Sequence, residues 1–159
     1  MKKVILFTTV VVLLVSIVAV PIALAKKGDT PANDKPNTLY LYEKDANWDI
    51  VWDGAWGNMS FKLDDTNIDF VFNGHGLEKN TEYTLISYND PWPGSTVCLA
   101  SGTSNGGGNI NLKGSADLGK SEGIKIWLVL TSDLGIDGMT GWNPSEYLFE
   151  HNLIPNPDI

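Results

Sequence analysis

Short runs of alternating apolar and polar residues constrain this chain more than any other feature of its sequence. The alternation begins at Thr38, and no stretch beyond it keeps a helical period. Successive side chains of a β-strand point to opposite faces, so this pattern indicates strands with one buried face. The final long run, residues 124–131, is almost wholly apolar, which is typical of a strand covered on both faces. The predicted strands lie at residues 39–42, 48–53, 58–63, 68–73, 83–88, 97–103, 110–113, 124–131 and 147–150.

Turn residues separate these runs. Asp53-Gly54 is a two-residue hairpin signal, and residues 105–109, Asn-Gly-Gly-Gly-Asn, form a wider one. Residues 90–94 hold two prolines that cannot donate to a strand ladder, so they are expected in a loop. About eight or nine short strands at this spacing predict an all-β domain, an antiparallel β-sandwich or a barrel.

Residues 76–85, GLEKNTEYTL, resemble the E–F corner of fibronectin type III domains. The resemblance implies that the Tyr83 hydroxyl bonds back to the backbone of the preceding turn and that Leu77 fills the core beneath it. Fibronectin modules have one strand after the corner strand, whereas several apolar runs follow Tyr88 here. We therefore expect an immunoglobulin-like sandwich with extra strands.

A wider resemblance covers the region after the N-terminal segment. It is similar to a loose group of exported β-domain proteins of archaea and some bacteria, to which we can assign no activity. The resemblance implies a secreted β domain and nothing finer. It is carried by the segments 53–57 (DGAWG), 70–77 (FVFNGHGL), 88–94 (YNDPWPG) and 125–129 (KIWLV).

Residues 1–25 have the pattern of an export signal. Two lysines follow Met1, the run from Val4 to Ala25 is uncharged, and Ala23-Leu24-Ala25 is a small-x-small cleavage pattern. The uncharged run is also long enough for an uncleaved membrane anchor, although Pro21 beside the predicted cut favours cleavage. Both alternatives predict a secreted or cell-surface protein that touches the membrane only through this helix, if at all.

The remaining chain divides into a linker and one domain. Residues 26–37 contain two prolines, five charges and no large apolar side chain, which predicts a flexible linker. Residues 38–159 are enough for a single β-sandwich domain. Asn58-Met59-Ser60 is an N-glycosylation pattern that an exported chain can use, and the alternation places Asn58 on the solvent-facing side of its strand.

Composition excludes several classes of function. The chain has eleven Lys plus Arg, all of them lysine, against nineteen acidic residues, and its net charge is −8. An acidic chain without arginine is a poor nucleic-acid binder, so we expect no nucleic-acid partner. One cysteine and two histidines exclude a disulfide within the chain and a His/Cys zinc site. We expect Cys98 to be buried in a strand.

No catalytic constellation is recognisable. A nucleophile triad needs a histidine near a serine or cysteine, and His75 is expected in a turn rather than beside such a nucleophile. A glycan hydrolase needs only two facing carboxylates, so that alternative stays open. No cofactor is predicted except calcium, for which Asp133 and Asp137 are the candidate ligands.

The tryptophans are the most informative residues for binding. Trp48 and Trp52 share the alternation of their run and are expected in the core, and Trp127 in the buried strand is expected to be structural. Trp92, between two prolines, and Trp142 are expected to be exposed, where flat rings can stack on sugars. Asn89 and Asp90 are the polar candidates beside Trp92.

Three functions follow from these patterns. The first is a non-catalytic extracytoplasmic module that binds protein or builds the cell envelope. The second is a carbohydrate-binding module that uses exposed tryptophans and a calcium ion. The third is a small carboxylate-dependent glycan hydrolase. The expected partner is accordingly a protein or a glycan at the cell surface.

Overall fold

The computed structural model describes residues 38–88, 96–119 and 124–154. The predicted signal or anchor segment (1–25) and the linker (26–37) lie outside these ranges, as do Asn89, Asp90 and Trp92. Within the described ranges, no helix is long and apolar enough to cross a membrane.

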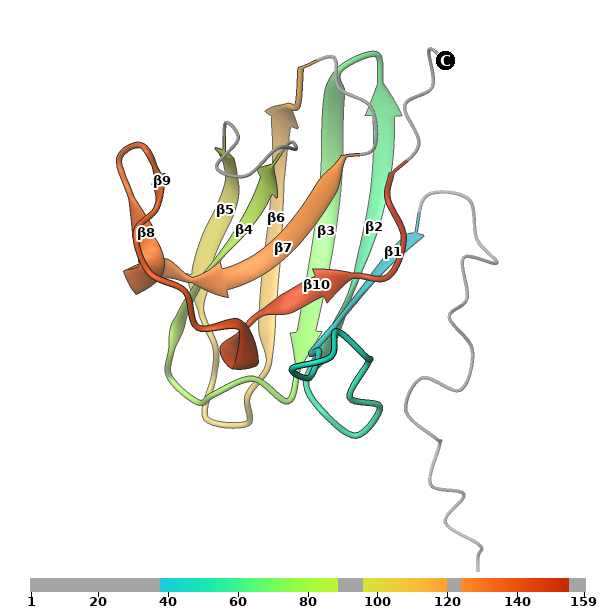
Figure 1. Ribbon diagram of the computed structural model, residues 1–159. Coiled ribbons are helices and arrows are strands. Elements are labelled where there is room, and N and C mark those ends of the chain that lie inside the picture. Colours follow the sequence, from blue (N-terminus) through green and yellow to red (C-terminus); the bar gives the residue numbers. More distant parts are fainter. Residues whose placement is uncertain (1–37, 89–95, 120–123, 155–159) are drawn as a thin grey trace, which may run out of the picture.

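Eight strands of the described residues form one antiparallel sheet, in the order β5-β4-β7-β10-β1-β2-β3-β6 (Figure 1). A separate two-stranded hairpin, β8–β9, follows β7. Residues 131–133 and 144–146 form short 3-10 turns on either side of this hairpin. The strands are β1 Thr38–Tyr42, β2 Trp56–Asp64, β3 Asn67–His75, β4 Glu82–Tyr88, β5 Thr96–Thr103, β6 Ile110–Asp117, β7 Lys125–Leu130, β8 Leu134–Gly135, β9 Gly138–Met139 and β10 Leu148–Glu150.

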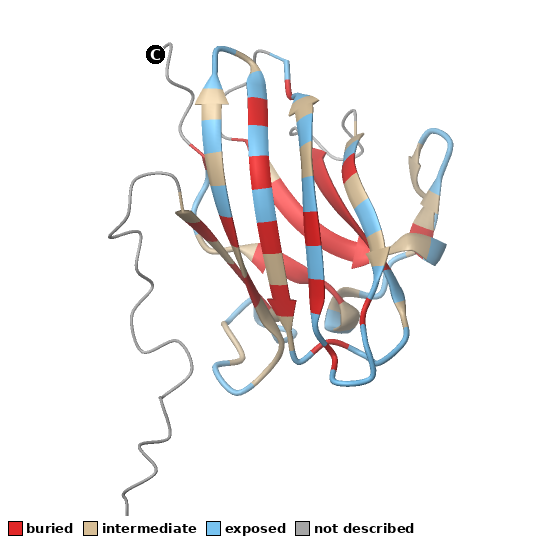
Figure 2. Cartoon of the chain, turned by 180° about the vertical axis from the view of Figure 1, so that it is seen from behind, coloured by how far each residue is buried: buried red, intermediate tan, exposed pale blue. Residues whose placement is uncertain are grey.

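The sheet is rolled almost into a barrel. Its two edge strands, β5 and β6, lie side by side and are joined by residues 104–109 (Figures 1 and 2). Gly102 and Gly114 let the edges approach, because a Cβ at Gly102 would lie 2.8 Å from Leu112 Cδ2 and one at Gly114 would lie 3.3 Å from the Leu99 carbonyl oxygen. The all-β prediction is confirmed, in the form of a single curved sheet.

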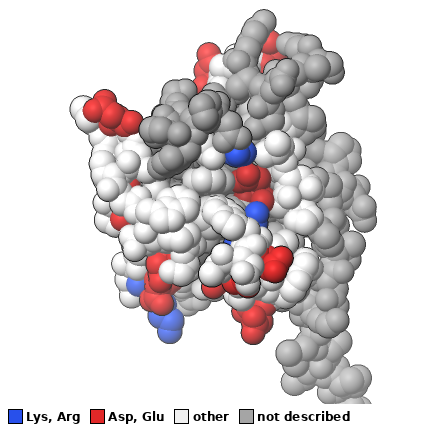
Figure 3. All heavy atoms as spheres, viewed as in Figure 1, with Lys and Arg blue, Asp and Glu red and all other residues white. Residues whose placement is uncertain are grey.

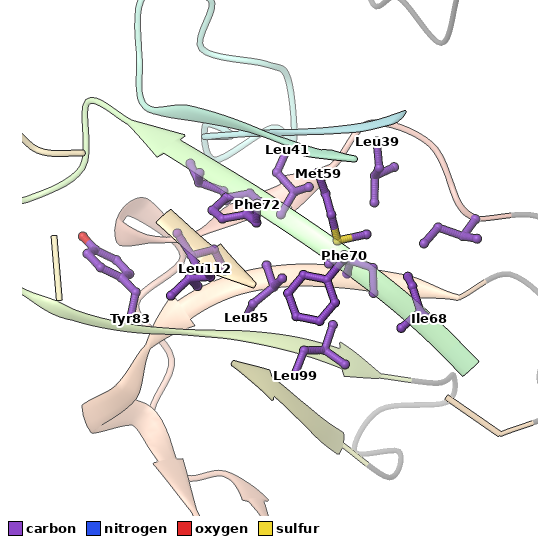
Figure 4. Packing of buried hydrophobic residues seen from close by; sticks show 14 of the residues in the cluster. Leu39, Leu41, Met59, Ile68, Phe70, Phe72, Tyr83, Leu85, Leu99 and Leu112 are labelled. Atoms are coloured by element: carbon purple, nitrogen blue, oxygen red, sulfur yellow. The ribbon is translucent and has the colours of Figure 1, made fainter. Parts of the chain in front are cut away.

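The interior of the roll is the main hydrophobic core. Burial alternates along β3, so that Ile68, Phe70 and Phe72 face inward while Asp69 and Val71 face solvent (Figure 2). Side chains from both halves of the sheet meet in this interior, as Figure 4 shows for residues of β1 to β6. The period-two pattern predicted this arrangement, since each strand contributes every second residue.

A second cluster lies on the outer face of β4, β7 and β10. Along β7 the side chains divide between the two clusters: Ile126 and Leu128 pack in the interior, while Trp127 and Val129 pack outside. The prediction of a strand buried on both faces is confirmed for this segment. The outer cluster consists of Ile86, Tyr88, Trp127, Val129, Tyr147 and Phe149.

The predicted strand at residues 48–53 is wrong, and so is the core placement of its tryptophans. This segment belongs to the connection between β1 and β2, where Trp48 is 53% and Trp52 46% exposed. The reason is local hydrogen bonding. Asp45 Oδ1 accepts the backbone N–H groups of Asn47 and Asp49 at 2.8 and 3.0 Å, and Trp48 has a φ of 65°. An extended strand allows neither feature.

Cys98 is exposed on β5, contrary to the expected burial. The pairing of β4 with β5 is irregular between Leu85 and Ile86, which pair with Ala100 and Cys98. Leu99 takes the inward position in this stretch and is buried. Because neighbouring residues of a strand face opposite sides, Cys98 points outward.

The corner before β4 has the hydrogen bond that the sequence predicts. The backbone N–H of Glu78 donates to the Tyr83 hydroxyl at 3.3 Å, and burial raises the pKa of Tyr83. Leu77 and Tyr83 are both buried in the interior cluster. Asn58, the third residue of β2, lies between two buried neighbours and faces outward.

Candidate functional site

The outer cluster opens into a groove with aromatic walls. The described residues that line it are Lys44, Trp48, Tyr88, Lys125, Trp127, Trp142, Phe149 and Glu150, and its volume is about 640 Å³. We call this the aromatic groove. It lies on the face that Figure 3 presents, where uncharged atoms surround a small patch in which carboxylate and lysine atoms lie together.

Phe149 is the ring that connects the walls. Its centroid lies 5.1 Å from that of Trp127, 5.0 Å from that of Trp48 and 6.4 Å from that of Trp142. Phe149 and Trp127 are buried, whereas Trp48 and Trp142 expose about half of their surface, 53% and 47%. The groove therefore has a buried aromatic floor and two partly exposed indole walls.

The connection between β1 and β2 holds Trp48 in place. The backbone carbonyl of Asp45 accepts a hydrogen bond from the Trp48 backbone N–H at 3.0 Å, in addition to the bonds that the Asp45 side chain accepts. Lys44 forms an isolated β-bridge with Ile50. The Lys44 ammonium lies 5.7 Å from the Trp48 ring centroid, within the range of a cation–π contact. These backbone contacts hold the turn that carries Trp48, and the Lys44 ammonium contacts the indole itself.

A partly buried hydrogen-bond network holds the segment that carries Trp142. Tyr147 donates its hydroxyl to the Asp133 carboxylate, and Asn143 Nδ2 donates to the same carboxylate oxygen at 2.8 Å. The Asn143 backbone N–H in turn donates to the Tyr147 hydroxyl at 3.0 Å. Burial, together with the Asp133 hydrogen bond, raises the pKa of Tyr147, so the phenol keeps its proton. We call these three residues the Asp133 network.

The same network bears on the predicted calcium ligands. Asp133 is buried and its carboxylate is engaged by Tyr147 and Asn143, while Asp137 is exposed at the β8–β9 turn. The described residues include no group of three or more His, Cys, Asp or Glu side chains placed to hold a metal ion. In this structure Asp133 positions the chain segment that carries Trp142.

Glu150 is the one carboxyl group among the described residues of the groove. Its Oε2 is buried and has no hydrogen-bond partner in the described part of the chain, although Trp127 donates a side-chain hydrogen bond to the carboxyl group. Burial raises the pKa of Glu150 to about 7, and the charges of Lys44 and Lys125 only partly offset this. Burial also lowers the pKa of the neighbouring His151.

The structure brings some of the predicted site residues together. Trp142 and Trp127 both line the groove, and Trp127 is buried as predicted. Trp92, Asn89 and Asp90 lie outside the described residues, directly after Tyr88, which lines the groove. Sequence reasoning missed Trp48, Phe149 and Glu150. The polar stretch Lys44-Asp45-Ala46-Asn47 is the signal that could have placed Trp48 in a turn.

Comparisons of the chain with protein-family models, with curated proteins and with solved structures gave no match. What the groove can do follows from its chemistry. Flat rings, two ammonium groups and a carboxyl group suit the non-covalent binding of a ligand that has both apolar faces and polar edges.

Proposed function

We propose that this chain is an exported, non-catalytic binding module that holds a glycan in the aromatic groove. The observation that carries the proposal is the pair of half-exposed indoles, Trp48 and Trp142, on the two walls of one groove about 640 Å³ in volume. A sugar ring has apolar C–H faces that stack on aromatic rings and hydroxyl edges that hydrogen-bond to Lys44, Lys125 and Glu150. A groove of this volume lies within the usual range for ligand sites.

Export is supported by the sequence of the N-terminal segment. A positive start, an uncharged run and a small-x-small pattern are typical of a signal that delivers the domain outside the cytoplasm. The glycan would then belong to a cell surface or its surroundings. For the fold, the Tyr83 corner supports an immunoglobulin-like sandwich in which the two halves of the rolled sheet are the layers.

Hydrolysis by paired carboxylates receives less support than binding does. A glycosidase of that kind needs two carboxyl groups that face each other across the substrate. Glu150 is the single carboxyl group among the described residues that line the groove. We therefore propose binding without turnover.

The test is a glycan panel read by tryptophan fluorescence and calorimetry. Trp142→Ala and Trp48→Ala should each weaken binding about tenfold, or ~1.4 kcal/mol, because each removes one wall. Trp52→Ala is the matched control: Trp52 is also about half exposed, but it packs against Tyr42 and does not line the groove. A panel without any binder, or an equal loss in the Trp52 variant, would contradict the proposal.

A further inference from the structure

The described residues of the groove carry more positive than negative side chains, whereas the molecule as a whole is acidic. The chain as a whole carries a net charge of −8. The described residues lining the groove include two lysines, Lys44 and Lys125, and one carboxyl group, Glu150. Among the described residues of the groove, two positive charges thus accompany one carboxyl group, in a protein that is acidic as a whole. Such a local field favours anionic ligands and repels cationic ones.

Both ammonium groups lie over aromatic rings that line the groove. Lys44 Nζ lies 5.7 Å from the Trp48 centroid and 6.0 Å from the Phe149 centroid. Lys125 Nζ lies 5.2 Å from the Tyr88 ring and donates to its hydroxyl at 3.4 Å. Each charge therefore accompanies a ring of the same groove, and a ligand that stacks on the rings comes within reach of the charges.

From this placement we propose that the glycan is acidic, a polysaccharide segment whose uronic-acid carboxylates pair with Lys44 and Lys125 while its ring faces stack on Trp48 and Trp142. This inference rests on the proposed function and names its ligand class. Attraction between charges that are partly shielded from water by aromatic rings is stronger than at an open surface. A neutral sugar would use the rings but not the two charges.

Binding of an acidic glycan is coupled to protonation of the Glu150 carboxyl group. Among the described residues, the charges that act on its carboxyl are Lys44 from the β1–β2 connection and Lys125 from β7, while Tyr88 from β4 lines the same groove and His151 is the next residue in the chain. A ligand carboxylate close by disfavours a second negative charge, so the bound state holds the Glu150 proton more firmly. Because burial already brings its pKa to about 7, binding takes up a proton from solvent at neutral pH. Affinity for an acidic glycan should accordingly rise as the pH falls.

The experiment compares glycans that differ only in charge. Short oligogalacturonates and oligomannuronates are titrated into the full chain by calorimetry, beside the same oligomers with their carboxylates methyl-esterified. We expect at least one acid to bind about tenfold more tightly than its ester, with an advantage severalfold larger at about pH 6 than at about pH 8. Titration in buffers with different ionisation enthalpies should show proton uptake for the acid and none for the ester.

Three variants locate the effect. Lys44→Met should bring the affinity for the acid close to that for the ester, whereas Lys113→Met, a lysine of β6 outside the groove, should leave both unchanged. Glu150→Gln should abolish the proton uptake. If esters or other neutral glycans bind as tightly as the acids, and Trp142→Ala still weakens their binding, this inference is overturned while the proposed function stands. If no glycan of either kind binds, both fail.

Discussion

Glu150 holds a buried carboxyl group whose Oε2 finds no hydrogen-bond partner among the described residues. Its pKa rises from the ordinary 4.5 to about 7, mainly through burial. Between these two values the folded chain keeps a proton that the unfolded chain has lost. The stability that Glu150 contributes is therefore fully present below about pH 4.5 and is lost as the pH rises toward about 7.

Glu150→Gln should remove this dependence, because glutamine fills the same space without ionising. We expect the variant to exceed the parent in free energy of unfolding at about pH 8 by on the order of 1–3 kcal/mol, and to approach it at about pH 4.5. Urea unfolding at both pH values measures the difference. Glu82→Gln, at an exposed position of β4, is the control and should change nothing. Parallel pH profiles for parent and Glu150→Gln would show that Glu150 ionises freely.

Single residues are where sequence reasoning was least reliable. Alternation alone put Trp48 in the core, but the Asp45 side chain closes a turn and exposes the indole. Apolar neighbours suggested a buried Cys98, but Leu99 takes the inward position. Both errors have the same cause: a period-two pattern gives no indication of where a turn or a pairing irregularity changes the face.

Among the elements, the segment between β7 and β10 matters most for the site, because it carries Trp142. The Asp133 network fixes it from within. Asp133→Ala would leave the hydroxyl of the fully buried Tyr147 without its acceptor. An unpaired buried polar group costs roughly 1–3 kcal/mol.

We expect Asp133→Ala to lower stability by that amount and also to weaken glycan binding, since Trp142 lies next to Asn143 of the network. Asp137→Ala is the matched control: the second of the predicted calcium ligands is exposed, and its loss should alter neither quantity. Chemical unfolding and the glycan titration provide the two measurements. Equal effects of the two variants, reversed by added calcium, would instead support an ion site at this hairpin.

The elements themselves were largely predictable. The strand β3 follows from side-chain periodicity, β7 follows from an almost wholly apolar run, and the corner at Tyr83 follows from a local motif with a known hydrogen bond. The groove was predictable only in part. Trp142 and Trp127 could be singled out, but Phe149 and Glu150 come from β10, whose position between β7 and β1 depends on pairing across the whole chain.

The shape of the molecule depends on how closely the two edge strands of its sheet, β5 and β6, approach each other. Local sequence does not specify strand order, and the closure of the roll at β5 and β6 brings together strands that share no ladder. Small residues at this seam are the feature that makes closure feasible. Without a side chain at Gly102, Leu112 of β6 can pack into the interior, where it is buried.

Gly102→Ala should therefore destabilise the whole domain rather than one loop. The added methyl would lie 2.8 Å from Leu112 Cδ2, so the seam has to open or the leucine has to shift. Overpacking of this kind costs about 1–3 kcal/mol, which lowers the melting temperature by several degrees. Gly106→Ala, in the loop that joins the same two strands, meets no atom within 4 Å and is the control. Thermal unfolding followed by circular dichroism separates the two, and identical melting temperatures would mean that β5 and β6 lie further apart in solution than the rolled sheet requires.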